Sequence, residues 1–271
     1  MISSAACSGG GSDAFPEGSL AVSASNDVAV GANRLLVGVS LPDGTRLGSP
    51  NDPVTFAISP RDDPTAVERF PAQFVWIVDD VVGIYRANVE TDRPGVWSVV
   101  VESEDGAEIA PAAFQVKPDP ATPALGTPAI SIPTPTLDDL PLEELTTDPE
   151  PDPSFYGLSL DDALDSGRPT VVVFATPAFC KTASCGPMLD NSKAVAPRHP
   201  GVDFVHVEVY QGFGKPGFAP DAAHLAPAVR AWGLPSEPWV FVADAGGTIV
   251  AKFEGVLDPA ELDEALSSLG A

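Results

Sequence analysis

The chain has 271 residues, which predicts two domains at roughly 150 residues for each. It carries 38 acidic and 14 basic residues, for a formal net charge of −24. Binding to nucleic acid or to an anionic membrane surface needs dense Lys and Arg, so this charge argues against both partners. The three cysteines exclude a framework of several disulfides and leave one pair and one odd residue.

The odd cysteine, Cys7, lies in the first segment, residues 1–17. The stretch "SSAACSGGGSDA" has small residues before Cys7 and a Gly/Ser-rich run after it, and it resembles a bacterial lipoprotein cleavage site followed by its tether. It departs from that pattern at Ser4, where Leu is usual, and in having only six residues before the cysteine. The resemblance implies a disordered tether, lipidation of Cys7, and an extracytoplasmic protein of the cell envelope that meets the membrane only through this anchor. A disordered tail with an incidental cysteine is the alternative.

Residues 18–117 are predicted to form an all-β unit. Seven short apolar runs between turn signals favour a sandwich of two sheets. The segment "GIYRANVETDRPGVWSVVVE" resembles the late hairpin of extracytoplasmic immunoglobulin-like domains, with Tyr85 and Trp97 as core anchors. The unit contains no His, Cys or Met, which disfavours a copper-binding sandwich. A stalk or a partner-recognition module is the expected role.

Residues 118–154 are predicted to be a linker. The segment is rich in proline and in acidic residues, and it contains no Lys or Arg. Proline fixes φ and like charges repel, so a semi-rigid extended spacer is expected.

Residues 155–271 change character. The continuous apolar run "TVVVFAT" predicts a strand buried on both faces of an α/β sheet. The expected order is helix, strand, helix, strand, helix, strand, strand, helix, with helical stretches that include "DAAHLAPAVRAWG".

This order resembles the thioredoxin superfamily. "GRPTVVVFATPAFC" is similar to the strand that leads to the active-site cysteine, and "WGLPSEPWVFV" is similar to the loop that carries a cis-proline. The resemblance implies an α/β thioredoxin-like fold, with Pro238 as the cis-proline and Glu237 beside it in substrate docking. Three features depart from the family pattern. Four residues separate the cysteines instead of two, and Val173 stands where a buried acidic residue is expected. Glu237 precedes Pro238, where an apolar residue or Thr is usual.

Cys180 and Cys185 are the candidate catalytic residues. Five positions along an ideal helix would separate their Cα atoms by roughly 8.6 Å, beyond the ~7 Å limit for a disulfide. Pro187 favours a helix that starts near Gly186, which leaves Cys180 in a loop and Cys185 at the N-terminal cap. There the helix dipole lowers the pKa of a thiol, but the sequence does not rank the two cysteines.

These residues predict an extracytoplasmic thiol–disulfide oxidoreductase that acts on protein thiols or disulfides through a redox-active disulfide, without a cofactor or a metal site. One alternative is a non-catalytic binding or scaffold lipoprotein with a structural disulfide. Another is a thiol peroxidase, because "CKTASCGPMLD" is similar to the C-x4-C pair of some peroxiredoxins. Val173 and Pro177 replace the Pro and Thr of that motif.

The loop "YQGFGKPGFAPD" follows a predicted strand and contains Phe213 and Phe218. Binding sites gather at the carboxyl ends of strands in α/β sheets, so both rings are candidates for docking of a partner polypeptide. Packing of the loop on its own domain is the equally weighted alternative.

Overall fold

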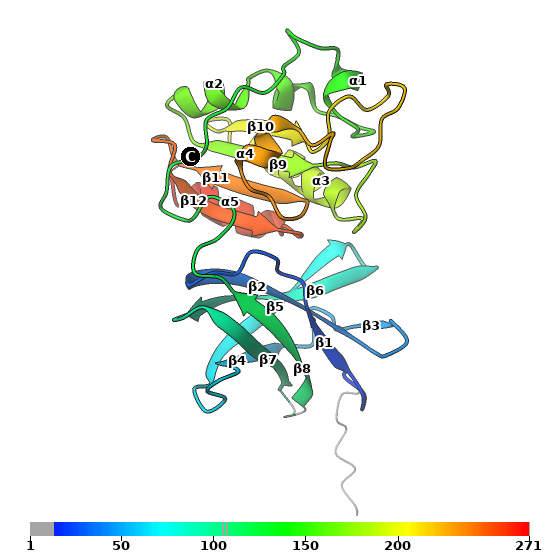
Figure 1. Ribbon diagram of the computed structural model, residues 1–271, viewed down its shortest axis with the longest axis vertical. Helices are drawn as coiled ribbons and strands as arrows, with labels where there is room; N and C mark the ends of the chain where they lie inside the picture. The colour runs from blue at the N-terminus through cyan, green and yellow to red at the C-terminus, as the bar shows by residue number, and fades with distance from the viewer. Residues whose placement is uncertain (1–13, 105, 107, 271) are drawn as a thin grey trace, which may run out of the picture.

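The computed structural model describes residues 14–104, 106 and 108–270. Two units are stacked along the long axis of the molecule, a β unit formed by the first half of the chain and a layered unit formed by the second (Figure 1). Residues 118–154 run between them and along the second unit.

Eight strands form the first unit. In chain order they are β1 (Leu20–Ser23), β2 (Gly31–Ser40), β3 (Arg46–Leu47), β4 (Val54–Pro60), β5 (Glu68–Val78), β6 (Val82–Thr91), β7 (Gly95–Ser103) and β8 (Glu108–Val116). Their order in the sheet is β1-β8-β7-β4-β5-β6-β2-β3, and β1 also pairs with β2. Seven strands therefore close into a barrel, with β3 attached outside the ring.

The closed barrel corrects the predicted immunoglobulin-like sandwich. β1 is four residues long, yet it pairs in parallel with β8 at Leu20↔Ala110 and antiparallel with β2 from Leu20↔Ser40 onward. A strand that pairs on both sides joins what would have been two open sheets, and closure removes the free edges. The predicted anchors do lie in the barrel core, where Tyr85 is 1% exposed and Trp97 is 3% exposed.

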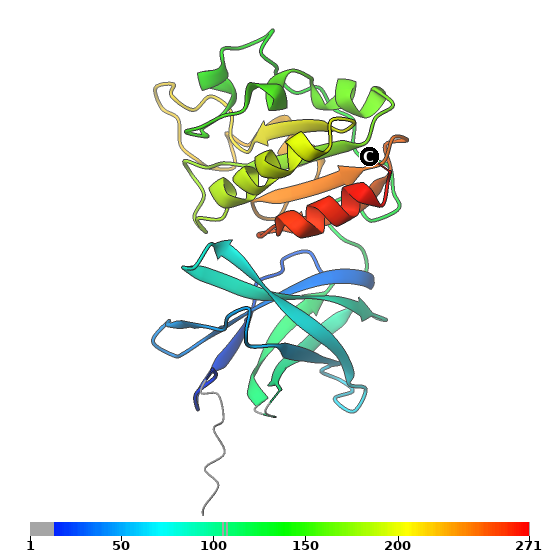
Figure 2. The same ribbon diagram turned by 180° about the vertical axis from the view of Figure 1, so that it is seen from behind.

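The second unit contains one four-stranded mixed sheet of order β10-β9-β11-β12. Its elements are α1 (Leu142–Leu145), η1 (Pro153–Tyr156), α2 (Leu160–Asp165), β9 (Thr170–Ala175), α3 (Cys185–Val195), η2 (Ala196–Arg198), β10 (Asp203–Glu208), α4 (Pro227–Ala231), β11 (Trp239–Ala243), β12 (Ile249–Glu254) and α5 (Pro259–Ser267). β9 and β10 are parallel, and every residue of both strands is buried. Helices α3 and α5 lie side by side on one face of the sheet (Figure 2).

The predicted thioredoxin-like fold class is corrected as well. The chain is mostly β, with a closed barrel and a small second sheet, and among the described residues only α3 and α5 of five α-helices exceed about two turns. The helix expected over Asp221–Gly233 shortens to the five residues of α4, because Pro227 stands in its first turn. Element order and a cysteine pair do not specify a superfamily, and this architecture does not support the assignment to the thioredoxin-like superfamily.

Residues 118–154 differ from the free spacer that was expected. Gly126 N–H donates to the Ile249 carbonyl at 2.8 Å, and Ala129 N–H donates to the Gly247 carbonyl at 2.7 Å. Further along, Leu145 of α1 is buried in the same apolar cluster as β9 and α3. The segment is therefore fixed along the second unit by hydrogen bonds and by packing. The predicted boundaries at 118 and 154 stay predictions.

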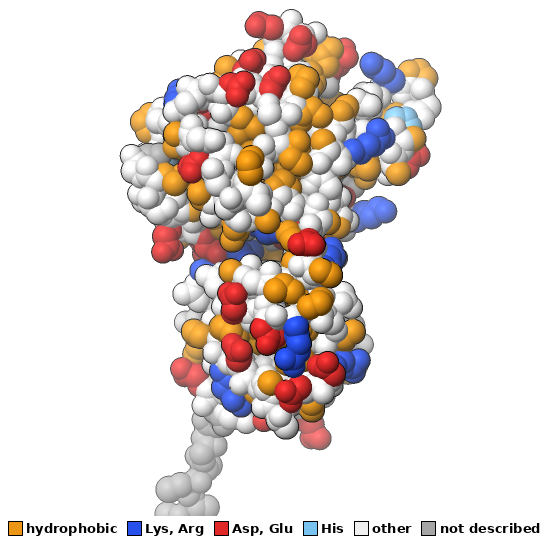
Figure 3. Space-filling model, turned by 60° about the vertical axis from the view of Figure 1, so that its left-hand side comes forward, with side chains coloured by type: hydrophobic (Ala, Val, Ile, Leu, Met, Phe, Trp, Pro, Cys, Tyr) orange, Lys and Arg blue, Asp and Glu red, His pale blue; other side chains and the backbone are white. Residues whose placement is uncertain are grey.

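The two units touch through a small apolar cluster and a set of polar contacts. Val256 packs with Leu36, Val75 and Ile84 of the barrel. Around this contact, acidic and basic side chains gather at the junction of the two lobes (Figure 3). The β5–β6 hairpin reaches the first turn of α3, where Ile77 and Pro187 line the same small hollow. The barrel therefore supports the helix that carries Cys185.

Candidate functional site

The two cysteines flank the entry to α3. β9 ends at Ala175, and the chain turns through a loop to Cys180 and on to Ser184, which precedes the helix. Ala183 adopts φ +58°, a left-handed conformation that bends this loop back. Cys185 is the first residue of α3, one position before the predicted start. The loop and the helix start together bring the cysteines close, as the position of Pro187 suggested.

Both cysteines are free thiols. No disulfide joins them in the structure. The structure therefore corrects the expectation of a disulfide between them. Cys180 is partly exposed and Cys185 is fully buried, at 0% exposure. A partner molecule can reach only the first of these sulfur atoms.

The surroundings shift the pKa values of the two thiols in opposite directions. The adjacent Cys185 thiol lowers the pKa of Cys180 to about 5, against the opposing effect of burial and with help from Thr182, whose Oγ1 lies 3.3 Å from Cys180 Sγ. The Thr182 hydroxyl is held in turn by Ser184 Oγ at 2.7 Å. The Cys180 side chain and burial strongly raise the pKa of Cys185. At neutral pH the exposed sulfur is a thiolate and the buried one keeps its proton.

Glu237 and Pro238 directly precede β11. The Glu237–Pro238 peptide bond is cis, as predicted for Pro238, and Pro238 is buried at the start of β11. Burial raises the pKa of Glu237, the negative charge of Cys180 raises it further, and Lys181 opposes both effects. The roles of Glu237 and Pro238 in docking stay predictions.

The loop after β10 carries the two rings predicted to dock a partner, Phe213 and Phe218, and places them in different surroundings. Phe218 packs against Phe179, the neighbour of Cys180, with ring centroids 5.0 Å apart, and against His224 at 5.2 Å. Phe213 does not join this cluster and instead lines a cavity beside β10. Tyr210 packs on Phe179 at 6.1 Å and also lines that cavity. Phe218 therefore supports the loop of Cys180, and partner contact by either ring stays a prediction.

The sequence analysis missed Glu208 and Thr176. Glu208 is paired in register with Ala175, so its side chain shares the face of the sheet on which α3 packs. Glu208 Oε1 and Thr176 Oγ1 are both buried, and the Thr176 hydroxyl lies close enough to the Glu208 carboxyl to influence its pKa. Burial raises the pKa of Glu208 to about 7, while the Thr176 hydroxyl and the Thr147 backbone lower it. The available signal was an acidic residue within the apolar run "VDFVHVEVY".

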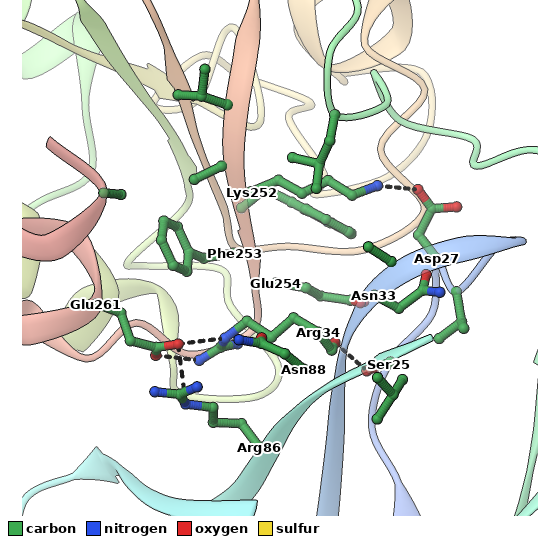
Figure 4. Close-up of a pocket in the computed structure, with 18 of the residues that line it drawn as sticks. Ser25, Asp27, Asn33, Arg34, Arg86, Asn88, Lys252, Phe253, Glu254 and Glu261 are labelled. Atoms are coloured by element: carbon green, nitrogen blue, oxygen red, sulfur yellow. Dashed lines mark hydrogen bonds and ion pairs between the residues drawn. The ribbon is translucent and has the colours of Figure 1, made fainter. Parts of the chain in front are cut away.

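A second pocket, of about 540 Å³, lies between the barrel and β12. Figure 4 shows Arg34 and Arg86 of the barrel reaching the Glu261 carboxylate, and Lys252 pointing toward Asp27. Asp27 also accepts hydrogen bonds from the backbone of the segment that leaves the barrel. Most charges here already have partners, so the cluster acts as a contact between the units.

Other predicted features lie elsewhere or stay untested. Cys7 falls outside the described residues, so its lipidation and the envelope localisation stay predictions. Within residues 14–104, 106 and 108–270, no helix is long and apolar enough to cross a membrane. The same residues contain no group of three or more His, Cys, Asp or Glu side chains arranged to hold a metal ion.

Comparison with known proteins adds no family to this description. No protein-family model matches the chain, and no curated protein matches its sequence.

Proposed function

We propose that the protein exchanges thiols and disulfides with partner polypeptides, with Cys180 as the nucleophile and Cys185 as the resolving thiol. The observation that supports this proposal is the asymmetry of the pair: an accessible thiol with its pKa lowered to about 5 touches a fully buried thiol whose pKa is raised. A low pKa populates the nucleophilic thiolate. A purely structural pair does not require either an accessible sulfur or a stabilised thiolate.

The reaction starts from the two free thiols. The Cys180 thiolate attacks one sulfur of a partner disulfide, whose S–S bond breaks, and the other partner sulfur leaves as a thiolate. Cys185 then loses its proton to solvent or to the leaving thiolate and attacks Cys180 Sγ. The mixed disulfide breaks and the second partner thiolate leaves. Two electrons have passed from the cysteine pair to the partner, and the reverse sequence oxidises a partner dithiol.

The mixed disulfide provides the test. In a Cys7→Ser background, the reduced protein is mixed with a peptide that contains one intramolecular disulfide, and the products are measured by mass spectrometry. With Cys185→Ser the covalent adduct should accumulate on Cys180, because the resolving thiol is absent. With Cys180→Ser no adduct should form. The Cys7→Ser parent should convert the peptide to its dithiol without a lasting adduct.

The two alternative functions, a scaffold protein and a thiol peroxidase, predict other products. A scaffold protein would form no adduct in the Cys185→Ser variant even though iodoacetamide still alkylates Cys180. A thiol peroxidase would convert Cys180 to a sulfenic acid with hydrogen peroxide, trapped by a dimedone reagent, much faster than it reacts with the disulfide peptide. Either result would contradict the exchange proposal.

A further inference from the structure

The Pro-rich segment, residues 118–154, makes a direct contact with the loop that carries Cys180. Thr147 N–H and Thr147 Oγ1 both donate to Glu208 Oε2 at 2.8 Å. The same hydroxyl oxygen accepts a hydrogen bond from Ala178 N–H at 3.1 Å. Ala178 lies two residues before Cys180, in the loop that follows β9. One side chain of the Pro-rich segment therefore joins the buried end of β10 to the loop of the nucleophile.

The two hydrogen bonds of the Thr147 hydroxyl are complementary. A hydroxyl has one proton to donate and two lone pairs that accept. The Thr147 proton goes to the carboxyl of Glu208, which is 6% exposed and fixed on β10. The hydroxyl oxygen is then an acceptor, as Ala178 N–H requires. The buried carboxyl therefore orients the hydroxyl, and the hydroxyl holds the loop.

The same part of the segment is also held on α3, the helix that begins at Cys185. Asp148 pairs with Lys193 of that helix at 2.7 Å, and their side chains are only 5% and 15% exposed. Lys193 Nζ also donates to the Glu150 carbonyl at 2.9 Å. Residues 147–150, which we call the bridging segment, therefore contact both the loop before Cys180 and the helix that follows it.

The position of this loop controls the reactivity of the Cys180 sulfur. The hydrogen bond from the Cys185 side chain is the largest cause of the lowered pKa of Cys180. That hydrogen bond persists only while the two sulfur atoms stay within reach of each other. Cys185 is fixed at the start of a buried helix, whereas Cys180 lies on a partly exposed loop. Contacts that hold the loop therefore maintain the thiolate.

We propose that Thr147 is a positioning residue for the nucleophile: its hydroxyl holds the loop of Cys180, through Ala178 N–H, in the place from which the thiolate attacks. This inference deepens the proposed function and rests on it for the assignment of Cys180 as the nucleophile. Placement of a reacting group within about 1 Å strongly affects its rate, so a contact outside the cysteine pair can control exchange. The Pro-rich segment is accordingly a part of the reactive site.

Three variants in a Cys7→Ser background test this role. Thr147→Val keeps the size of the side chain and removes the hydroxyl, whereas Thr147→Ser keeps the hydroxyl. Thr127→Val is the matched control, because the Thr127 hydroxyl lies on the same Pro-rich segment and donates to the Ala124 carbonyl at 2.7 Å, away from the cysteine loop.

Two quantities are measured for each variant: the midpoint of Cys180 alkylation by iodoacetamide against pH, and the rate of exchange with the disulfide peptide at pH 7. Thr147→Val should raise the midpoint and slow exchange about fivefold or more, the factor that one ordinary hydrogen bond supports. Thr147→Ser and Thr127→Val should keep both values of the parent.

The two measurements separate this inference from the exchange reaction itself. If the parent exchanged with the peptide while Thr147→Val kept its midpoint and rate, the positioning role would be rejected. A loss in Thr147→Ser as large as in Thr147→Val would also reject it, because the hydroxyl would not be responsible. If the parent did not exchange at all, the proposed function would fail, and the alkylation midpoints would still decide the role of Thr147.

A measurement on the parent covers the case in which Thr147→Val does not fold, which circular dichroism would show. Ala178 is exposed, so its amide proton exchanges quickly with D₂O unless the hydrogen bond to Thr147 protects it. Nuclear magnetic resonance should show slowed exchange of this amide. Exchange at the rate of an unstructured peptide would overturn the proposal.

Discussion

Arg34 of barrel strand β2 and Glu261 of helix α5 form a bidentate ion pair between the two units, with N···O distances of 3.0 and 2.7 Å. Both side chains are 10% exposed. Arg86 Nε adds a second ion pair to the same carboxylate at 3.2 Å. One carboxylate therefore balances two nearly buried guanidinium groups, in addition to the apolar cluster around Val256 and the Asp27–Lys252 contact between the same units.

Glu261→Gln should destabilise the protein strongly. The substitution leaves two guanidinium groups nearly buried without a counter-charge, and breaking a buried pair costs on the order of 3 kcal/mol or more. The measurement is the free energy of unfolding in urea. Glu102→Gln is the matched control, because Glu102 pairs with Arg69, whose side chain is 58% exposed, and such surface pairs contribute about 1 kcal/mol at most. Equal losses in the two variants would contradict the role given to Glu261.

Closure of the barrel and the contacts between the units could not be predicted from local patterns. Alternation identified most strands of the barrel, and it placed Tyr85 and Trp97 correctly in a core. Alternation says nothing about which strands pair, and the decisive pairs are made by the four residues of β1. The Arg34–Glu261 contact joins positions far apart in sequence, and no period or motif marks it.

Cys180 should react as a low-pKa thiol. The rate of its alkylation by iodoacetamide, measured against pH in a Cys7→Ser background, should rise with a midpoint near the pKa of about 5. Cys185→Ala should move this midpoint upward, because it removes the hydrogen bond from the Cys185 side chain that is the largest cause of the lowered pKa. Thr182→Val should give a smaller upward shift, since it removes the hydroxyl 3.3 Å from the sulfur. A midpoint near the usual 8.5 of a free cysteine would contradict this environment.

The cysteine site was predictable in part. Pro187 predicted that a loop and a helix start would bring Cys180 and Cys185 together, and α3 does begin at Cys185. Which sulfur is exposed could not be predicted, because it depends on packing of Met188 and Leu189 against the sheet and on the bend at Ala183. Glu208 was missed because an acidic residue inside an apolar run gives no sign of whether it points to solvent.

Tyr85→Phe should destabilise the barrel modestly. The Tyr85 hydroxyl donates to the Asp52 carbonyl at 2.8 Å, while its ring packs edge-on against Phe74 at 5.1 Å. Removing only the hydroxyl loses one buried hydrogen bond, for about 1 kcal/mol. Tyr85→Ala also removes the ring and leaves a cavity, for roughly 3–5 kcal/mol. Urea denaturation should rank the two variants in that order, and a Phe variant as unstable as the Ala variant would show that the hydroxyl dominates.

Glu208→Gln should change how stability depends on pH. Burial raises the folded-state pKa of Glu208 from 4.5 to about 7, so the folded state holds this proton over a pH range in which the unfolded chain has lost it. The stabilising contribution is complete below pH 4.5 and is lost as pH rises toward 7. The loss amounts to roughly 3 kcal/mol.

The glutamine variant cannot titrate at this position, so the difference in unfolding free energy between it and the wild type should shift in favour of the variant between pH 5 and pH 8. Other groups titrate equally in both proteins and cancel in this difference. Glu143→Gln is the control for the substitution itself, because Glu143 is exposed on α1. If the difference in unfolding free energy between Glu208→Gln and the wild type stayed constant, the Glu208 carboxyl would have to be solvated in the folded protein. That result would contradict its burial beneath the Pro-rich segment, where Thr147 donates hydrogen bonds to it.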